Sequence, residues 1–258
     1  MLSLTEIEKQ YPANLRPFKN FLLREYLQYK ILQIIFSSEF ANKLCFLGGT
    51  CLRIVHNNSR FSEDLDFDNS GLTENQFKKI AEIIKVNLEA EGYAIEMKNV
   101  MKGAYHCYIR FPGLLFKEGL SGYRNEKILI QLDTEPKHFK FTPDMVIINK
   151  FDVFTEIAVT PIQLLLSQKL YAILNRTRAK GRDFFDTMFL LSKSKPDYRY
   201  LKQKLKISTP DQLREAILKK CSTINMNVMV KDVQEFLFNP NDKNKIRLFV
   251  KYFEKVEL

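Results

Sequence analysis

The sequence predicts an α/β protein with two lobes, a mixed-sheet lobe over residues 1–155 and an α-helical lobe over residues 156–258. Two patterns lead to this fold class. Before residue 155, short apolar or alternating runs typical of strands interrupt amphipathic helical stretches, whereas from Pro161 onward only helical spacing recurs. A chain of 258 residues buries about 70–75 % of its unfolded surface, which suffices for one large domain or two smaller lobes.

In the first lobe, apolar residues at helical spacing predict a helix over residues 15–40, and the apolar run Leu44–Leu47 predicts a buried strand. Thr73 and Gln76 form a capping-box pattern, which predicts a helix that ends near Gly92. Two further segments alternate or are continuously apolar, with glycines between them, and are predicted to be strands: residues 104–111 and 127–133.

The second lobe is predicted to be helical throughout. Its apolar residues recur at helical spacing in five segments: residues 161–175, 182–192, 210–221, 228–238 and 243–255. Pro210 fits the first turn of the third segment, because the N–H that proline lacks would have no partner there.

The net charge of +10 comes from the second lobe. Residues 1–159 carry 20 Lys and Arg against 20 Asp and Glu, whereas residues 160–258 carry 20 against 10. This asymmetry favours a polyanionic partner near the helical lobe, since each neutralised phosphate releases counterions. A lysine-rich face that only keeps the helices solvated would give the same pattern. The aromatic residues among these charges suit either stacking on unpaired bases or the helical core: Tyr198, Tyr200, Phe249 and Tyr252.

Several protein classes are disfavoured. The four cysteines have no CxxC spacing and lie in apolar or mixed segments, which is typical of buried, reduced thiols and not of zinc ligands. The sequence has no basic segment followed by an apolar leader, and no apolar run approaches 18 residues. We therefore expect a soluble, cytoplasmic protein that does not enter a membrane.

The most informative motif is a pair of acids one residue apart. Asp64 and Asp66 flank Leu65, and the two-residue period of an extended strand places both carboxylates on one face. Mg²⁺ is usually held by one or two carboxylates together with substrate phosphates, so the pair indicates phosphoryl or nucleotidyl transfer and not redox or acyl chemistry.

A Gly-Gly turn precedes these acids. Gly48 and Gly49 follow the predicted strand Leu44–Leu47, at the point where a helix is expected to begin, and Thr50 and its neighbours would offer backbone N–H groups to a phosphate. A DxD sequence in a polar loop and a Gly-Gly turn are each common, but their combination is more specific.

Three later positions suit the same chemistry. Asp133 is the first acid on its face of a predicted strand and would complete a metal cluster, or it is a strand-end acid in solvent. Lys169 lies in an apolar helical segment, where it either snorkels to solvent or points into a site in which phosphates compensate its charge. Arg182 and Asp183 suit a charge pair at a helix start, and the residues alone favour that interpretation.

Together these motifs resemble the AbiEii family of nucleotidyltransferase toxins, which includes the MenT-type toxins. The first block of the resemblance consists of Gly48-Gly49-Thr50, Leu52-Arg53, Arg60, Ser62 and Asp64-Leu65-Asp66-Phe67. A later block is similar to the lysine and arginine-aspartate motifs of the family: Lys169, Arg176 and the GRDFFD sequence at residues 181–186. The resemblance covers residues 44–191 in the expected order. The interval between Gly49 and Asp64 is long for nucleotidyltransferases at large, although it suits this family.

The resemblance implies a nucleotidyltransferase-like fold and a role for each matching residue. The implied catalytic residues are Asp64, Asp66, Lys169 and Asp183. The implied nucleotide-binding residues are Gly48, Gly49, Thr50, Arg60, Ser62 and Arg182. Asp64 and Asp66 would hold Mg²⁺ or Mn²⁺, with Asp133 as the candidate third ligand.

The activity that the resemblance implies is transfer of a nucleoside monophosphate from an NTP to the 3′ end of tRNA, which blocks aminoacylation and translation. A separately encoded antitoxin would restrain it. Two alternatives remain open. One is transfer to a small molecule, as in antibiotic-modifying nucleotidyltransferases, and the other is a non-catalytic interaction module on the same fold, against which the intact DxD argues.

Overall fold

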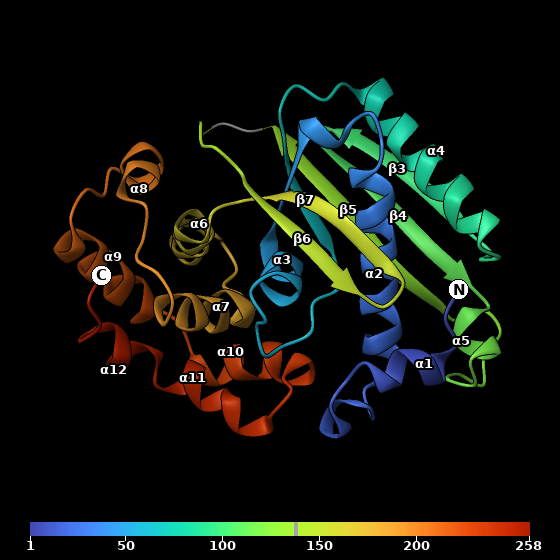
Figure 1. Ribbon diagram of the computed structural model, residues 1–258. Helices are drawn as coiled ribbons and strands as arrows, with labels where there is room; N and C mark the ends of the chain where they lie inside the picture. Colours follow the sequence, from blue (N-terminus) through green and yellow to red (C-terminus); the bar gives the residue numbers. More distant parts are fainter. Residues whose placement is uncertain (137–138) are drawn as a thin grey trace. The chain divides into compact units, whose positions relative to one another are not determined.

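The computed structural model describes residues 1–136 and 139–258 and divides into two compact units (Figure 1). Unit 1 comprises residues 1–56 and 61–159, and unit 2 comprises residues 57–60 and 160–258. We predicted a single boundary at residue 155. In the structure unit 1 ends at Val159, and the short segment Asn57–Arg60 groups with the helical unit although it lies within the N-terminal half of the chain.

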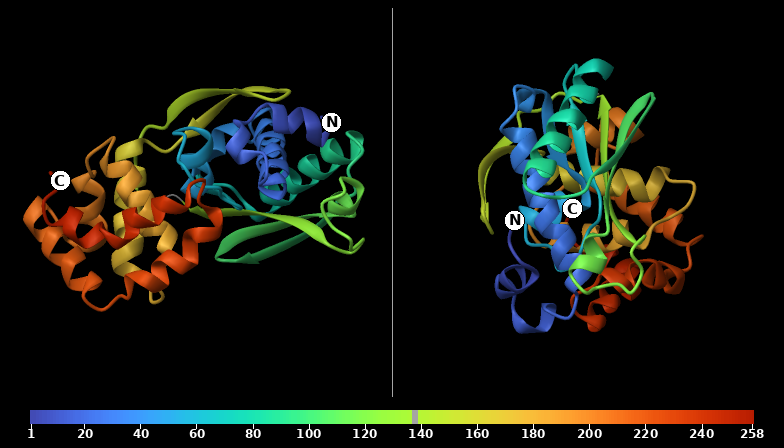
Figure 2. Two further views of the ribbon diagram at one scale, coloured as in Figure 1. Left: turned by 90° about the horizontal axis from the view of Figure 1, so that it is seen from below. Right: turned by 90° about the vertical axis from the view of Figure 1, so that its right-hand side faces the viewer.

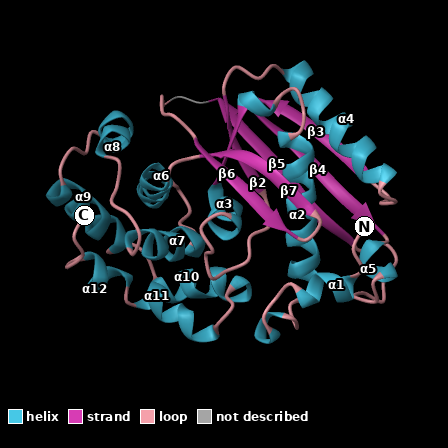
Figure 3. Cartoon of the chain, in the orientation of Figure 1, coloured by secondary structure: helices cyan, strands magenta, loops and turns pink. Residues whose placement is uncertain are grey.

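Unit 1 is built on one seven-stranded sheet with the order β3-β4-β5-β2-β1-β7-β6 (Figure 3). Strand β2 runs antiparallel to β1 and parallel to β5, β1 runs parallel to β7, and the other neighbouring pairs are antiparallel. The strands are β1 (Leu44–Leu47), β2 (Leu65–Asn69), β3 (Glu96–Lys102), β4 (Ala104–Pro112), β5 (Lys127–Pro136), β6 (Asp144–Lys150) and β7 (Val153–Val159).

The helices of unit 1 are α1 (Leu4–Lys9), α2 (Lys19–Phe36), α3 (Gly48–Ile54), α4 (Glu74–Ala90) and α5 (Leu114–Lys117), with 3₁₀ turns at Ala13–Leu15 and Ala41–Lys43. The predicted capping box is confirmed, since the Thr73 hydroxyl accepts from Gln76 N and the Gln76 side chain accepts from Thr73 N. Helices α2 and α4 contact each other and pack on the sheet, α2 on β7 and β5 and α4 on β3 and β4 (Figure 2).

Strands β3, β6 and β7 were not predicted. Strand β3, EMKNVMK, and strand β6 are the two edges of the sheet, and β3 buries none of its residues. An edge strand obtains its backbone hydrogen bonds from a single neighbour without needing an apolar face, so the period-two pattern that reveals inner strands is absent there. Strand β6 even exposes Met145 and Ile147.

Unit 2 is helical in every described residue beyond Thr160 that has regular structure. Its helices are α6 (Ile162–Asn175), α7 (Gly181–Leu191), α8 (Tyr198–Leu205), α9 (Pro210–Cys221), α10 (Met226–Val233), α11 (Lys243–Arg247) and α12 (Phe249–Phe253), with 3₁₀ turns at Gln234–Phe236 and Pro240–Asp242. Pro210 occupies the first turn of α9 as predicted. No helix in the described ranges is long and apolar enough to cross a membrane.

Two of the predicted helices of this unit differ in extent. The segment 228–238 is α-helical only to Val233 and continues as the 3₁₀ turn Gln234–Phe236. The segment 243–255 is broken at Leu248, whose φ of −94° and ψ of 4° separate α11 from α12. Helix α8 was not predicted. Its short sequence, YRYLKQKL, is stabilised by Asp197, whose carboxylate accepts hydrogen bonds from Arg199 N and Tyr200 N.

Candidate active site

Acidic side chains gather on one face of strand β2. Leu65, Phe67 and Asn69 are buried on the opposite face, whereas Asp66 and Asp68 are half-buried. Because side chains alternate with a period of two, Asp66 and Asp68 share a face. Asp64 lies one residue before the strand and is also half-buried. The structure thus adds Asp68, a third acid that the sequence argument had not singled out.

Asp133 lies on the neighbouring strand, directly opposite Asp66 in the parallel register of β2 and β5. Its carboxylate accepts from Gln131 Nε2, at 2.8 Å for Oδ1 and 2.9 Å for Oδ2. His106 faces it from β4, with Nδ1 2.7 Å from Asp133 Oδ1. An ionised carboxylate can only accept, so this imidazole nitrogen donates. Asp66, Asp133 and His106 therefore form a row across three adjacent strands.

Gly48 is fitted to Asp66. Its φ of +81° is a left-handed conformation that side chains disfavour, and a Cβ built there would stand 2.0 Å from Asp66 Oδ2. The turn after β1 can therefore approach the carboxylate only because this residue has no side chain. This contact gives a physical reason for the glycine in the motif.

Two more of the predicted nucleotide-binding residues hold the loop that leads into β2: Thr50 from helix α3, and Ser62 within the loop itself. Thr50 is fully buried, and its hydroxyl donates to the carbonyl of Asp64. Ser62 is half-buried, and its carbonyl accepts from Gln28 Nε2 at 3.0 Å. These contacts fix the backbone from which Asp64 projects.

A buried ion pair anchors helix α3 to α2, and the sequence did not reveal it. Arg53 donates to Glu25 through Nε, at 2.8 Å from Oε2, and through Nη2, at 3.1 Å from Oε1. Lys150 Nζ and the Tyr11 hydroxyl each lie 2.9 Å from the same Oε1. Burial raises the pKa of Glu25, but Arg53 and Lys150 outweigh that effect and hold the pKa below its ordinary value. The charged network holds in place the helix that begins at Gly48.

A metal would have to be held by few protein ligands. Within residues 1–136 and 139–258, no three His, Cys, Asp or Glu side chains are arranged to hold a metal ion. Asp64 and Asp66 nevertheless suit Mg²⁺, because both are half-buried and supply only oxygen donors. Asp133 as the third metal ligand stays a prediction. Both of its carboxylate oxygens already accept hydrogen bonds from Gln131.

A second cluster of charges lies in unit 2, around the buried carboxylates of Asp183 and Asp186. Arg60 is 2 % exposed and forms a bidentate ion pair with Asp186. Its Nε donates to Oδ1 at 2.7 Å, and its Nη2 donates to Oδ2 at 2.6 Å. Asn58 Nδ2 donates to Asp186 Oδ1 at 2.8 Å. These bonds attach the segment Asn57–Arg60 to helix α7. We predicted Arg60 as a phosphate ligand, but the structure directs its guanidinium to Asp186.

Lys169 joins this cluster from helix α6. Its Nζ lies 2.9 Å from Asp186 Oδ2 and 3.2 Å from Asp183 Oδ1, and its side chain is 14 % exposed. Arg176 Nε lies 3.0 Å from Asp183 Oδ2. Lys169 is therefore a member of an ion-pair network and does not snorkel to solvent. Arg182, the other predicted nucleotide-binding residue of this unit, is half-buried.

The cluster holds more positive than negative charge. Arg60, Lys169 and Arg176 face the two carboxylates of Asp183 and Asp186. Burial raises the pKa of Asp186, but Arg60 and Lys169 outweigh it and hold that pKa well below its usual range. Asp186 therefore stays ionised at neutral pH. The surplus cation of the cluster suits an anionic ligand.

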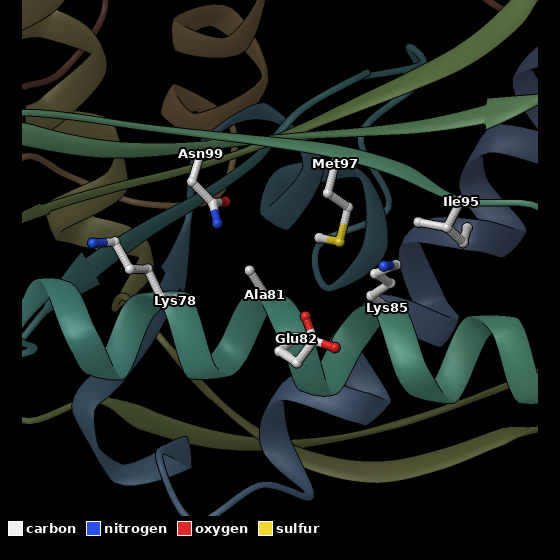
Figure 4. Close-up of a pocket in the computed structure, with 7 residues that line it drawn as sticks. All are labelled: Lys78, Ala81, Glu82, Lys85, Ile95, Met97 and Asn99. Atoms are coloured by element: carbon white, nitrogen blue, oxygen red, sulfur yellow. The ribbon is translucent and has the colours of Figure 1, made fainter.

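A small pocket of about 230 Å³ lies elsewhere in unit 1, between helix α4 and strand β3 (Figure 4). Lys78, Glu82 and Lys85 line it from the helix, and Met97 and Asn99 line it from the strand. None of the residues predicted from the sequence contributes to it, so it is not a candidate for the nucleotide site.

The family model described as "Nucleotidyl transferase AbiEii toxin, Type IV TA system" matches residues 30–257 of the chain. The chain belongs to the AbiEii family. It is thus a nucleotidyltransferase toxin of a toxin–antitoxin system, and the resemblance drawn from the Gly48 and Asp64 motifs is confirmed. Among curated proteins, none is similar enough in sequence to match the chain.

Two solved structures share the fold. The nucleotidyltransferase toxin MenT4 from Mycobacterium tuberculosis superposes with a TM-score of 0.61 at 13 % identity, over 100 % of this chain and 91 % of the other. JHP933 from Helicobacter pylori superposes with a TM-score of 0.55 at 17 % identity, over 91 % of this chain and 93 % of the other. At such identities the likeness shows the fold alone, and the predicted fold class is confirmed.

Proposed function

We propose that this AbiEii-family chain transfers a nucleoside monophosphate from an NTP to the 3′ end of an RNA, with tRNA as the acceptor, and so blocks translation. The observation that carries the proposal is the acidic face of unit 1, where Gly48 makes room for the Asp66 carboxylate beside Asp64. Membership of a nucleotidyltransferase family supports an NTP as substrate.

In the proposed reaction Asp64 and Asp66 would hold Mg²⁺ or Mn²⁺ together with the triphosphate. The ion, when bound, neutralises charge on the phosphates and polarises the reacting phosphoryl group. Backbone N–H groups at Gly49 and Thr50 bind phosphate oxygens. The acceptor hydroxyl oxygen bonds to the α-phosphorus, the bond from that phosphorus to the β-bridging oxygen breaks, and pyrophosphate leaves with the electron pair. The hydroxyl proton passes to a carboxylate of the site or to water.

Unit 2 contributes cationic groups to the proposal. Lys169 remains the predicted ligand of the triphosphate, with Asp183 holding its ammonium group in place at 3.2 Å. The surplus of positive charge in the cluster supports an anionic ligand. Arg60 is better assigned to anchoring its own segment, because both contacting nitrogens of its fork lie on Asp186.

Lys169→Ala tests this assignment against the matched change Lys219→Ala on helix α9. If Lys169 contacts the triphosphate, its removal weakens NTP use at least about tenfold, since a charge-assisted hydrogen bond is lost. Lys219→Ala should leave single-turnover chemistry unchanged. If Lys169→Ala binds NTP with the affinity of wild type and turns over at the same rate, Lys169 has only a structural role.

The RNA acceptor is proposed from the charge of unit 2. The 20 basic against 10 acidic residues of the range 160–258 support a polyanion. Tyr200 and Phe249 are buried, which matches the core interpretation of these aromatics, whereas Tyr252 is 37 % exposed. With a small-molecule acceptor, this charge would only keep the helices solvated.

The deciding experiment incubates the protein with Mg²⁺, total cellular RNA and each labelled NTP in turn. Label on an RNA of tRNA size, removable by trimming of the 3′ end, is the expected result. Absence of label on RNA from all four NTPs would favour the small-molecule reading. The antitoxin that the family implies would be sought separately, as a protein whose co-expression restores growth.

A further inference from the structure

Basic side chains recur at every second position where helix α6 passes into α7. Helix α6 ends at Asn175 and α7 begins at Gly181, and the basic loop between and just after these ends carries Arg176, Arg178, Lys180 and Arg182. Arg178 is exposed, and Lys180 and Arg182 are half-buried. Neither Arg178 nor Lys180 belongs to the proposed metal and nucleotide site.

The basic loop is fixed at its C-terminal end. Gly181 N donates to Asp232 at 2.8 Å, and a Cβ on Gly181 would stand 1.9 Å from the carbonyl oxygen of Met229, so α7 meets α10 there at close range. Asp183 N donates to the Lys180 carbonyl at 3.1 Å.

The N-terminal end of the loop is fixed as well. Arg176 N donates to the Ala172 carbonyl at 3.1 Å, and Lys220 Nζ of α9 reaches the Arg176 carbonyl at 3.3 Å. A loop held at both ends presents its charges without a large ordering cost when a ligand binds.

Ion pairs within unit 2 do not neutralise the positive charge of the loop. Asp183 is buried and paired with Lys169 and Arg176. Within the described part of the chain, the side chains of Arg178, Lys180 and Arg182 form no ion pair.

The lysines of helix α8 differ from the basic loop. Lys202 and Lys204 belong to the last turn of α8, where cations offset the negative end of the helix dipole. Two residues apart on a helix, they point in nearly opposite directions and do not form one charged face. The dipole of helix α8 therefore accounts for its two lysines, but it does not account for the cations of the basic loop.

We infer that the basic loop binds the sugar–phosphate backbone of the RNA acceptor. Guanidinium groups match phosphate oxygens with two parallel hydrogen bonds, and three of the four loop cations are arginines. A protein partner would need an apolar centre, but between the cations the loop offers only Thr177, Ala179 and Gly181. The inference rests on the proposed function, and it places the RNA beside the cluster of Lys169 and Asp183, since Arg176 belongs to both.

The test compares two matched double charge reversals. Arg178→Glu with Lys180→Glu changes one exposed and one half-buried cation of the loop, and Lys202→Glu with Lys204→Glu changes one exposed and one half-buried cation of α8. Neither pair includes a residue assigned to the catalytic or nucleotide site. Binding of purified tRNA is measured from 50 to 200 mM salt, with transfer kinetics and thermal melting alongside.

The loop variant should bind tRNA about tenfold or more weakly, with a slope of log K against log salt reduced by about 1.5 for two lost phosphate contacts. Its KM for RNA should rise while its KM for NTP and its melting temperature stay unchanged. The α8 variant should keep tRNA affinity within about twofold of wild type. Equal weakening in both variants, or an unchanged loop variant, would overturn the inference.

The outcome stays separable from the proposed function. If wild type labels RNA and the loop variant labels it with the same KM, the loop assignment fails while the transferase stands. If wild type binds tRNA through the loop but labels no RNA, the acceptor assignment fails while the docking surface stands. If wild type neither binds nor labels RNA, both fail.

Discussion

The two charged clusters of this chain are positioned in opposite ways. On the open face of unit 1, the row from Asp66 through Asp133 to His106 is set by strand register, with one side chain from each of three neighbouring strands. In unit 2, Asp186 is held by the side chains of Arg60, Lys169 and Asn58 and is completely buried.

This difference separates what each cluster is suited to do. Half-buried carboxylates fixed by the backbone remain accessible to a cation, and replacing one of them leaves the sheet hydrogen bonds intact. A buried carboxylate that three side chains share cannot be altered without leaving charges unpaired in a low-dielectric interior. We therefore expect changes on the open face to act on activity and a change of the buried carboxylate Asp186 to act on stability.

The largest effect should come from Asp66→Asn. Loss of a metal-binding charge at nearly constant volume should lower transfer about a thousandfold or more, since charge stabilisation in the transition state is lost. The melting temperature should stay the same or rise, because repulsion among acids is relieved. Asp144→Asn, at an exposed acid of strand β6 in the same sheet, is the matched control. Full activity of Asp66→Asn in transfer assays with Mg²⁺ would contradict the assignment of Asp66 as a metal ligand.

Asp186→Asn should cost about 3–5 kcal/mol of unfolding free energy, because it leaves buried cations without their partner. Urea unfolding measures the loss, and Asp211→Asn, an exposed acid of α9, should stay within about 0.5 kcal/mol of wild type. A loss in Asp186→Asn no larger than in that control would contradict the structural role of the cluster.

The same carboxylate makes stability depend on pH. Because the pKa of Asp186 is depressed in the folded state, its contribution is complete above its unfolded pKa of about 3.9 and is lost as the pH falls below it. The melting temperature of Asp186→Asn should therefore fall less than that of wild type between pH 5 and pH 3.

Gly48→Ala tests the fit between the turn and Asp66. The new Cβ would stand 2.0 Å from the Asp66 carboxylate and must displace it, and the alanine must adopt a φ of +81°. Activity should therefore fall, and the free energy of unfolding should decrease by about 1–3 kcal/mol. Gly71→Ala isolates the backbone cost, since its φ is +73° and nothing lies within 4 Å of its Cβ position. Equal losses in both variants would show that the contact with Asp66 has no separate effect.

Thr50→Val should have the smallest effect. The change removes the hydroxyl that donates to the Asp64 carbonyl and should cost about 1–2 kcal/mol, whereas Thr50→Ser keeps the donor and should recover most of that loss. Parallel urea titrations of the two variants give the comparison. A valine variant as stable as the serine variant would mean that the hydrogen bond contributes nothing.

The sequence was most informative where local pattern and function coincide. Leu44–Leu47, the Thr73 capping box and the Pro210 helix start were found because each is specified by residues close together in the chain. The family followed from short motifs for the same reason. The partners of Arg60 and Arg53 could not be found, because their carboxylates lie 126 and 28 residues away in sequence.

Asp133 and Lys169 show the intermediate case. Their residue type and segment were sufficient to nominate them, but His106 and Gln131 beside one, and Asp186 beside the other, depend on strand register and helix packing. Asp68 was missed for a different reason. It continues the alternation of Asp64 and Asp66 by one more step, so the signal was present in the sequence.

The bond between Arg60 and Asp186 also sets the order in which the protein becomes complete during synthesis. The two residues are 126 positions apart, and at about 5–20 residues per second the ribosome needs roughly 6–25 s to pass from one to the other. During that interval Gly48 and Asp66 have both been made, while the segment Asn57–Arg60 between them has no helix α7 to hold it. A nascent chain of this toxin must therefore finish most of its length before that segment reaches its final place.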